Sequence, residues 1–269
     1  MNEFEKEGFI TTNPCNINQV IDQQYSHTKQ LVLDINQYAQ SYQYQQEPNN
    51  LNKIQLTGTG LYARTLSTFQ GVINLANNGM KHQSDMLLRC LLESVFQLKA
   101  IANDPSFVEL LIMQSRNHTR NALERLVKMK NRNGQQDELY ERARKSRTKA
   151  RQELRQLRKK TDTSELSILT TARKAGMEDY YDTLYAMGST AVHSGLLSIE
   201  EHLVTDADNV VKELVNEPSH EKYEVTVLSA SDLMMNAVFA IDTIFNRSEN
   251  KEAEELGKRL QLALSHKAE

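Results

Sequence analysis

The 269-residue sequence contains few of the residues that turn a chain or cross-link it. It has ten glycines and four prolines, whereas average composition would supply roughly 32 of the two together at this length. Connections between short strands need turn-forming residues, so this scarcity excludes an all-β sandwich or barrel and favours long helices. The two cysteines, Cys15 and Cys90, are too few for a disulfide framework or a cysteine-based metal cluster.

Several signatures of chemistry are missing as well. The sequence has no glycine-rich phosphate loop, no HExxH pattern, no EF-hand loop and no cysteine–histidine spacing typical of a metal site. We therefore expect neither a metal nor another cofactor. Four histidines outside the patterns described below are scattered, and we expect them to be surface residues: His82, His118, His202 and His220.

Signals for export and for a membrane are also absent from the sequence. The opening residues, MNEFEKEGF, lack the basic and apolar regions of a secretory signal. The densest apolar stretches, around Met86–Leu92 and Phe107–Met113, are far shorter than the roughly 20 residues that a membrane span needs. These observations predict a cytoplasmic protein without a membrane partner.

What the sequence does contain is repeated helical spacing. Apolar residues recur at alternating steps of four and three, for example at Val32, Ile35, Ala39 and Tyr42, which is the period of a helix with one buried face. The pattern predicts an all-α fold, a single domain over 1–269 built as a bundle of about seven to nine helices. Apart from a short extended piece at Val210 and Val211, we predict no strand. The predicted helices cover about 13–45, 53–77, 82–103, 105–132, 136–160, 162–176, 178–203, 221–246 and 250–266.

The segment 82–103 differs from the other predicted helices. Its apolar residues, Leu92 and Phe96 among them, occupy all sides of the helix, which is typical of a helix at the centre of a fold. Cys90 lies in the same apolar run, so we expect it to be a small core residue. The segment should therefore pack against several neighbours at once.

Two charged residues four positions apart, Arg89 and Glu93, lie within this apolar segment. They share one side of the helix, and a buried arginine must be paired because an uncompensated buried charge is costly. We therefore expect both side chains to be largely buried and bonded across helices. The pair is either a structural ion pair that fixes the helix register or part of a functional site.

A second polar pattern, Tyr185, Ser189 and His193 at steps of four, forms one stripe on the predicted helix 178–203. Gly188 and Gly195 flank the stripe and leave room for a partner helix or a ligand. A histidine on a semi-apolar helix is most often a satisfied core residue, but two hydroxyls on its stripe also make it a candidate acid or base. The sequence thus indicates a candidate catalytic cluster, with a purely structural role as the alternative: Arg89, Glu93, Tyr185, Ser189 and His193.

Charge is distributed very unevenly along the chain. Residues 116–160, which we name the basic arm, carry sixteen basic against five acidic residues, a net charge of +11. The rest of the chain carries sixteen basic against 30 acidic residues, a net charge of −14. Two adjacent helices with narrow apolar stripes and a short connection predict an antiparallel hairpin over about 107–161 that projects from the bundle.

Basic side chains cover nearly all sides of the second helix of this hairpin. Such density is what neutralising the phosphates of a nucleic acid requires, and poor aromatic interleaving argues against readout of bases. An acidic protein surface, including that of a second copy, would serve as well, whereas a membrane helix is disfavoured because a broad apolar face is lacking. The candidate nucleic-acid-binding residues are Arg142, Arg144, Lys145, Arg147, Lys149, Arg151, Arg155, Arg158, Lys159 and Lys160.

The run from Leu87 to Glu93, taken with the stripe Tyr185–His193, resembles a bacterial all-helical family catalogued as a domain of unknown function. Members pair an R-x-x-L-E central helix with a later Y-x-x-x-S-x-x-x-H helix, and the similarity extends over about 60–245. The resemblance implies a helical bundle in which Arg89, Glu93, Ser189 and His193 meet, with no established reaction.

More distantly, this family resembles the HEPN (higher eukaryotes and prokaryotes nucleotide-binding) helical domains. Many HEPN domains are metal-independent ribonucleases of toxin and phage-defence systems, with an R-x(4–6)-H motif in one segment. Here Arg89 and His193 lie on separate predicted helices, a departure from that motif. By analogy, His193 would act as acid or base and Arg89 would hold the scissile phosphate.

The leading hypothesis is a helical-bundle protein whose basic arm engages RNA or DNA without sequence readout. The alternative is a HEPN-like ribonuclease in a phage-defence or toxin system, and a further alternative is a non-enzymatic scaffold or dimerisation protein. The sequence leaves open whether the protein is an enzyme.

Overall fold

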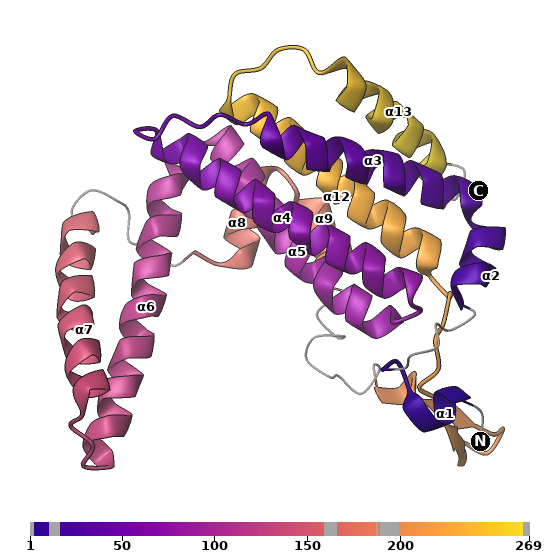
Figure 1. Ribbon diagram of the computed structural model, residues 1–269, viewed down its shortest axis with the longest axis horizontal. Coiled ribbons are helices and arrows are strands. Elements are labelled where there is room, and N and C mark those ends of the chain that lie inside the picture. Colours follow the sequence, from indigo (N-terminus) through magenta and orange to yellow (C-terminus); the bar gives the residue numbers. More distant parts are fainter. Residues whose placement is uncertain (1–2, 11–16, 159–165, 187, 189–198, 266–269) are drawn as a thin grey trace. The chain divides into compact units, whose positions relative to one another are not determined.

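The described part of the chain is almost entirely helical, with one two-stranded sheet (Figure 1), which confirms the predicted all-α class. The chain divides into two compact units: unit 1 comprises Met1–Asn103 and Ala172–Glu269, and unit 2 comprises Asp104–Thr171. The structure, a computed structural model, describes residues 3–10, 17–158, 166–186, 188 and 199–265.

Most predicted helices end within a few residues of the observed ones. The predicted segment 53–77 coincides with α4, because Asn52 caps its first turn by accepting from the backbone N–H groups of Ile54 and Gln55 at 3.0 and 3.2 Å. In chain order the elements are α1 (Glu3–Glu7), α2 (Ile17–Gln24), α3 (Ser26–Tyr44), α4 (Lys53–Asn77), α5 (Lys81–Asn103), α6 (Phe107–Arg132), α7 (Glu138–Leu157), α8 (Ile168–Ala175), α9 (Glu178–Tyr180), η1 (Tyr181–Tyr185), β1 (Leu203–Thr205), β2 (Val211–Leu214), α12 (Tyr223–Ile244) and α13 (Lys251–Ser265).

The centre of unit 1 is α12, which packs against α3, α4, α5 and α13. Its length and hydropathy would by themselves suit a membrane span, but 72% of that apolar window is buried inside the protein. We therefore describe α12 as a core helix. One apolar seam of α12, at steps of three and four, is buried, namely Ala230, Met234, Ala237, Ile241 and Ile244.

Helix α5 packs on α4 and α12, and its second half is buried as predicted, from Leu91 through Phe96 to Ile101. The expectation for Cys90 is wrong, because this residue is exposed. An all-round apolar pattern does not reveal which side of a helix lacks a neighbour, and α5 leaves the Cys90 side open.

The predicted first helix is interrupted. Tyr25 separates α2 from α3 with φ −124° and ψ 26°, outside the helical region. Its ring lies 5.2 Å from the ring of Tyr223, so tertiary packing accompanies the break in the helix. The predicted start of this helix at Asn13, and the predicted start of the helix 162–176, lie outside the described residues.

Gly79 ends the predicted second helix and allows close packing of unit 1. Its φ of +70° favours glycine, and a Cβ atom there would lie 2.8 Å from Cβ of Pro218 and 2.9 Å from N of Ser219. Ser219 donates its backbone N–H to the carbonyl of Gly79 at 3.0 Å. The absence of a side chain therefore lets the loop before α12 lie directly on the α4–α5 turn.

The predicted helix 178–203 begins at Glu178 as predicted, but it does not extend to Leu203. After α9 the backbone widens into the π-helical turn η1, and Leu203 begins β1, which pairs antiparallel with β2. The physical reason for the strands is the turn between them, where the Asp206 carboxylate accepts from the N–H groups of Asp208 and Val210. The expected extended piece at Val210–Val211 is confirmed in part, because β2 begins at Val211.

Unit 2 contains the predicted hairpin of α6 and α7. Arg116 contacts Glu153 at 3.1 Å and Glu124 contacts Arg151 at 2.7 Å, so residue numbers rise on one helix as they fall on the other. The two helices are therefore antiparallel (Figure 1). Gly134 makes the turn with a φ of +67°. The projection of the hairpin from the bundle, and the single domain over 1–269, stay predictions.

Candidate functional site

Arg89 on α5 bonds across to Tyr185 on η1, as expected for a partly buried arginine. Its Nη2 donates to the Tyr185 hydroxyl at 2.6 Å, and its guanidinium carbon lies 4.4 Å from the centre of the Tyr185 ring. Its Nε lies 3.4 Å from Oε1 of Glu93. The Arg89 side chain is 12% exposed and that of Glu93 is 34% exposed, so Glu93 is less buried than we expected.

The aromatic side of this cluster is stacked. The rings of Tyr181 and Tyr185 lie 4.8 Å apart and are inclined by 14°, and both belong to η1, a kind of turn frequently found at functional sites. A Cβ atom on Gly188 would lie 3.1 Å from Cβ of Arg89. Gly188 thus permits the close approach that the small residues in this segment predicted.

Ser189 and His193, the other members of the candidate catalytic cluster, lie outside the described residues. The structure therefore brings together Arg89, Glu93 and Tyr185, and the five-residue cluster stays a prediction. Among the described residues, Nη1 of Arg89 has no hydrogen-bond partner. The ribonuclease alternative, which needs both Arg89 and His193, stays a prediction for the same reason.

Replacing Arg89 by alanine is expected to lower the free energy of unfolding by about 2–3 kcal/mol, because the Tyr185 hydroxyl and the Glu93 carboxylate both lose a charged partner. Tyr185→Phe keeps the ring and removes only the hydroxyl, so we expect a loss of about 1 kcal/mol. Urea denaturation of both variants measures these values. Losses below about 0.5 kcal/mol in both would show that the cluster does not hold α5 to η1.

The five carboxylates of the basic arm are all engaged by basic side chains. Besides the two pairs that define the antiparallel register, Lys130 contacts Asp137 at 2.6 Å and Arg142 contacts Glu138 at 2.9 Å. The fifth acidic residue of the basic arm, Glu141, lies 3.8 Å from Arg144. These pairs neutralise only part of the positive charge of the arm.

The remaining cations of the hairpin are exposed on both helices. Within the stretch 116–158 that the structure describes, they have no carboxylate partner, although Arg158 donates to the amide oxygen of Asn117 at 3.4 Å. Lys159 and Lys160 of the predicted set lie outside the described residues. The exposed cations without a carboxylate partner are Arg125, Lys128, Arg132, Lys145, Lys149, Arg155 and Arg158.

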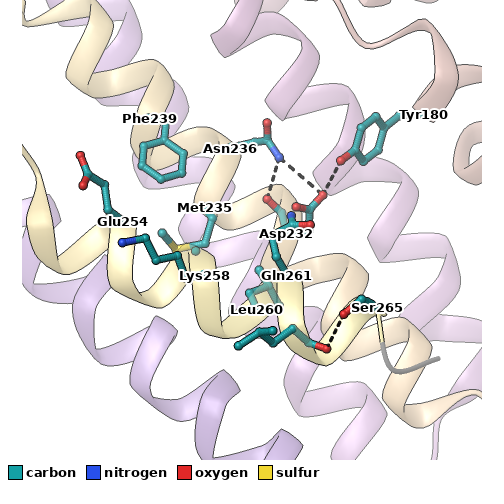
Figure 2. A pocket seen from close by; sticks show the side chains of 12 residues that line it. Tyr180, Asp232, Met235, Asn236, Phe239, Glu254, Lys258, Leu260, Gln261 and Ser265 are labelled. Carbon is teal, nitrogen blue, oxygen red and sulfur yellow. Dashed lines mark hydrogen bonds between the residues drawn. The ribbon is translucent and has the colours of Figure 1, made fainter. Parts of the chain in front are cut away.

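A groove of about 1090 Å³ lies in unit 1, lined by residues of α12, α13 and α9. Met235, Phe239 and Leu260 line its apolar part. At one end Asp232, Asn236 and Tyr180 point toward one another (Figure 2). The groove therefore combines an apolar wall with a small polar end, the usual make-up of a site for a small amphipathic molecule.

A hydrogen-bonded chain forms the polar end of the groove. Tyr180 donates its hydroxyl to Oδ2 of Asp232 at 2.5 Å, and Lys99 donates to Oδ1 of Asn236 at 2.9 Å. Burial raises the pKa of Asp232, and the bond from Tyr180 and the charge of Lys99 oppose that rise. Burial lowers the pKa of Lys99. Sequence reasoning missed this hydrogen-bonded network because its members lie far apart in the sequence. The local signal that could have revealed it is the spacing of Asp232 and Asn236 within the apolar α12.

Two of the histidines expected on the surface, His82 and His202, are instead half-buried neighbours. Their ring centres lie 4.5 Å apart, and Nδ1 of His82 lies 3.4 Å from Oε2 of Glu201. The same carboxylate is 3.3 Å from Nζ of Lys81 and 3.8 Å from Nζ of Lys222. Burial, together with the charge of His202, lowers the pKa of His82. The cluster joins α5 to the segment before β1 and to the start of α12.

In the described ranges, with their gaps at 11–16, 159–165 and 189–198, no group of three or more histidine, cysteine or carboxylate side chains has an arrangement that could hold a metal ion. The described residues offer three candidate binding features: an arginine–tyrosine cluster, an amphipathic groove and a basic hairpin.

Comparison with known proteins yields one match. Residues 55–210 match the family described as Family of unknown function (DUF5677). The matched stretch contains Arg89, Glu93, Tyr185 and the whole basic arm. No curated protein and no solved structure matches the chain, so its function has to be argued from the chemistry of its surfaces.

Proposed function

The chain belongs to DUF5677, a family of unknown function, and we propose that it binds the phosphate backbone of RNA or DNA through its basic arm without reading sequence. The observation that carries this proposal is the set of exposed cations on α6 and α7 that no described carboxylate neutralises. These cations are arginines and lysines, the side chains that neutralise phosphates and release condensed counterions.

The length of the charged surface suits a nucleic-acid strand. From Lys145 to Arg158, α7 rises about 20 Å at 1.5 Å per residue. Phosphates follow one another about every 3.4 Å along the axis of each strand, so a helix of this length can contact several of them. The proposal therefore concerns an extended polyanion rather than a single phosphate group.

The lack of an exposed phenylalanine, tyrosine or tryptophan in the basic arm supports binding without sequence readout. Tyr140, the single tyrosine of the basic arm, is 8% exposed and packs with Val127 and Ala143 in the hairpin core. Base stacking needs an accessible ring, and His118 is the exposed ring of the described part of the arm, so the arm offers the backbone mainly charge and hydrogen-bond donors. Discrimination between unrelated sequences of the same length should accordingly be small.

The test is a titration of the wild-type protein with two 20-base-pair RNA duplexes and two DNA duplexes of unrelated sequence, followed by fluorescence anisotropy between 50 and 200 mM salt. We expect the logarithm of the association constant to fall with the logarithm of the salt concentration with a slope of about −5, corresponding to about five neutralised phosphates. Within each pair of duplexes, the affinities should agree within about twofold.

Two outcomes would contradict the proposal: no binding of any duplex at 50 mM salt, or binding whose strength does not depend on salt. A salt-sensitive dimer without nucleic-acid binding would instead favour an acidic surface of a second copy as the partner. Sedimentation of the protein alone at low and high salt distinguishes this outcome.

A further inference from the structure

Several arginines of the hairpin surround one carboxylate. Nε and Nη2 of Arg151 on α7 donate to Oε1 of Glu124 on α6 at 3.1 and 2.7 Å. Nε of Arg120 lies 4.0 Å from the same oxygen. Glu124 thus binds cations from both helices through a single oxygen atom.

A third arginine, Arg147, adds its positive charge to this group. The bond from Arg151, followed by the charges of Arg151, Arg120 and Arg147, lowers the pKa of the Glu124 carboxyl. Nε of Arg147 is buried and has no hydrogen-bond partner among the described residues. Arg120 and Arg151 therefore share one carboxylate, the charge of Arg147 adds to theirs, and the positive charge of the group exceeds its negative charge.

Beyond this group, arginines on the same face of the hairpin donate hydrogen bonds to neutral amide oxygens. Nη2 of Arg120 also donates to Oδ1 of Asn121 at 2.8 Å, and Nη2 of Arg158 donates to Oδ1 of Asn117 at 3.4 Å. Amide oxygens orient these guanidinium groups without neutralising them. At Glu124, by contrast, guanidinium groups from both helices bind a single carboxylate.

We infer that Arg120, Arg147 and Arg151 form a phosphate-binding subsite that the Glu124 carboxylate occupies in the free protein. Guanidinium groups bind carboxylate and phosphate oxygens with the same planar donor geometry, so a backbone phosphate can take the place of the carboxylate. Glu124 then acts as an internal competitor that weakens binding of nucleic acid. This inference rests on the proposed function, because the phosphate is supplied by the RNA or DNA backbone.

The experiment compares Glu124→Gln with Glu138→Gln on the 20-base-pair RNA duplex. Both variants remove one negative charge from the hairpin, but Glu138 pairs only with Arg142 and both of these side chains are more than 75% exposed. We expect Glu124→Gln to bind about five- to tenfold more tightly than wild type and Glu138→Gln less than twofold more tightly. The salt slope of Glu124→Gln should steepen by about 0.9, the value for one added phosphate.

Adding Arg151→Ala to each variant tests whether the gain in affinity depends on Arg151. If the gain arises from freed guanidinium groups, Arg151→Ala should remove most of the gain of Glu124→Gln and leave that of Glu138→Gln unchanged. Circular dichroism of each variant verifies that the hairpin remains helical.

The outcomes separate this inference from the proposed function. Equal affinities of Glu124→Gln and Glu138→Gln, or weaker binding by Glu124→Gln, would overturn the subsite while the proposed function stands. Failure of the wild type and of every variant to bind the duplex at 50 mM salt would overturn both.

Discussion

Reversing the charge of Lys145, Lys149 and Arg155 together is expected to weaken binding of duplex RNA or DNA about 100- to 1,000-fold at 100 mM salt. Each of these side chains is exposed on α7 and has no carboxylate partner among the described residues, so each is available to a phosphate. Charge-assisted bonds to phosphate are about twice as strong as neutral ones, and glutamate at the same positions adds repulsion. Fluorescence anisotropy with the duplexes described above measures the loss.

A control variant carries three charge reversals in unit 1 instead of the basic arm, so its net charge changes by the same amount. Arg64, Lys251 and Lys258 are exposed on α4 and α13, and changing all three to glutamate should reduce affinity less than about tenfold through the general electrostatic term alone. If the two triple variants lose affinity equally, net charge rather than the basic arm determines binding.

Asp242→Ala is expected to lower the free energy of unfolding by about 3–5 kcal/mol, the largest stability loss that we predict for a single substitution. Asp242 on α12 is 7% exposed and accepts a hydrogen bond from the Tyr42 hydroxyl on α3 and another from Nδ2 of Asn250 at 2.7 Å. Removing the carboxylate leaves both donors without acceptors inside the protein. Urea denaturation followed by circular dichroism measures the change.

Two comparisons make this prediction specific. Asp242→Asn keeps an oxygen for Tyr42 and loses the acceptor for Asn250, so its cost should be intermediate, about 1–3 kcal/mol. Asp208→Ala, at an exposed turn position between β1 and β2, should cost less than about 0.5 kcal/mol. A loss at Asp242 no larger than that at Asp208 would show that the network does not stabilise the fold.

Helix positions were predictable where local signals and burial agree. The cap at Asn52 and the stop at Gly79 bracket α4, and the apolar seam of α12 is buried along its whole predicted length. Local signals failed at β1, where the predicted helix 178–203 gives way to a strand whose pairing with β2 depends on the turn side chain of Asp206. They failed again at Tyr25, where the structure has a ring contact with a residue from the distant α12.

For the candidate sites too, local sequence patterns predicted some contacts and missed those between residues far apart in the sequence. Burial of a charged residue on an apolar helix demands a partner, and this requirement, together with the polar stripe that begins at Tyr185, linked Arg89 to a residue 96 positions away. By contrast, nothing in local spacing connects His82 with His202 or Lys99 with Asn236. Such pairs become visible only when the chain has brought distant helices together.

The contacts between α3 and α12 also determine when unit 1 can fold during synthesis on the ribosome. The bond from Tyr42 to Asp242 joins residues 200 positions apart, whereas the bond from Arg151 to Glu124 spans 27 positions. Short-range contacts form first and long-range contacts are slow to form. The hairpin can therefore assemble while the chain is still being made, and the N-terminal helices must wait, with their apolar faces accessible to chaperones, until α12 emerges.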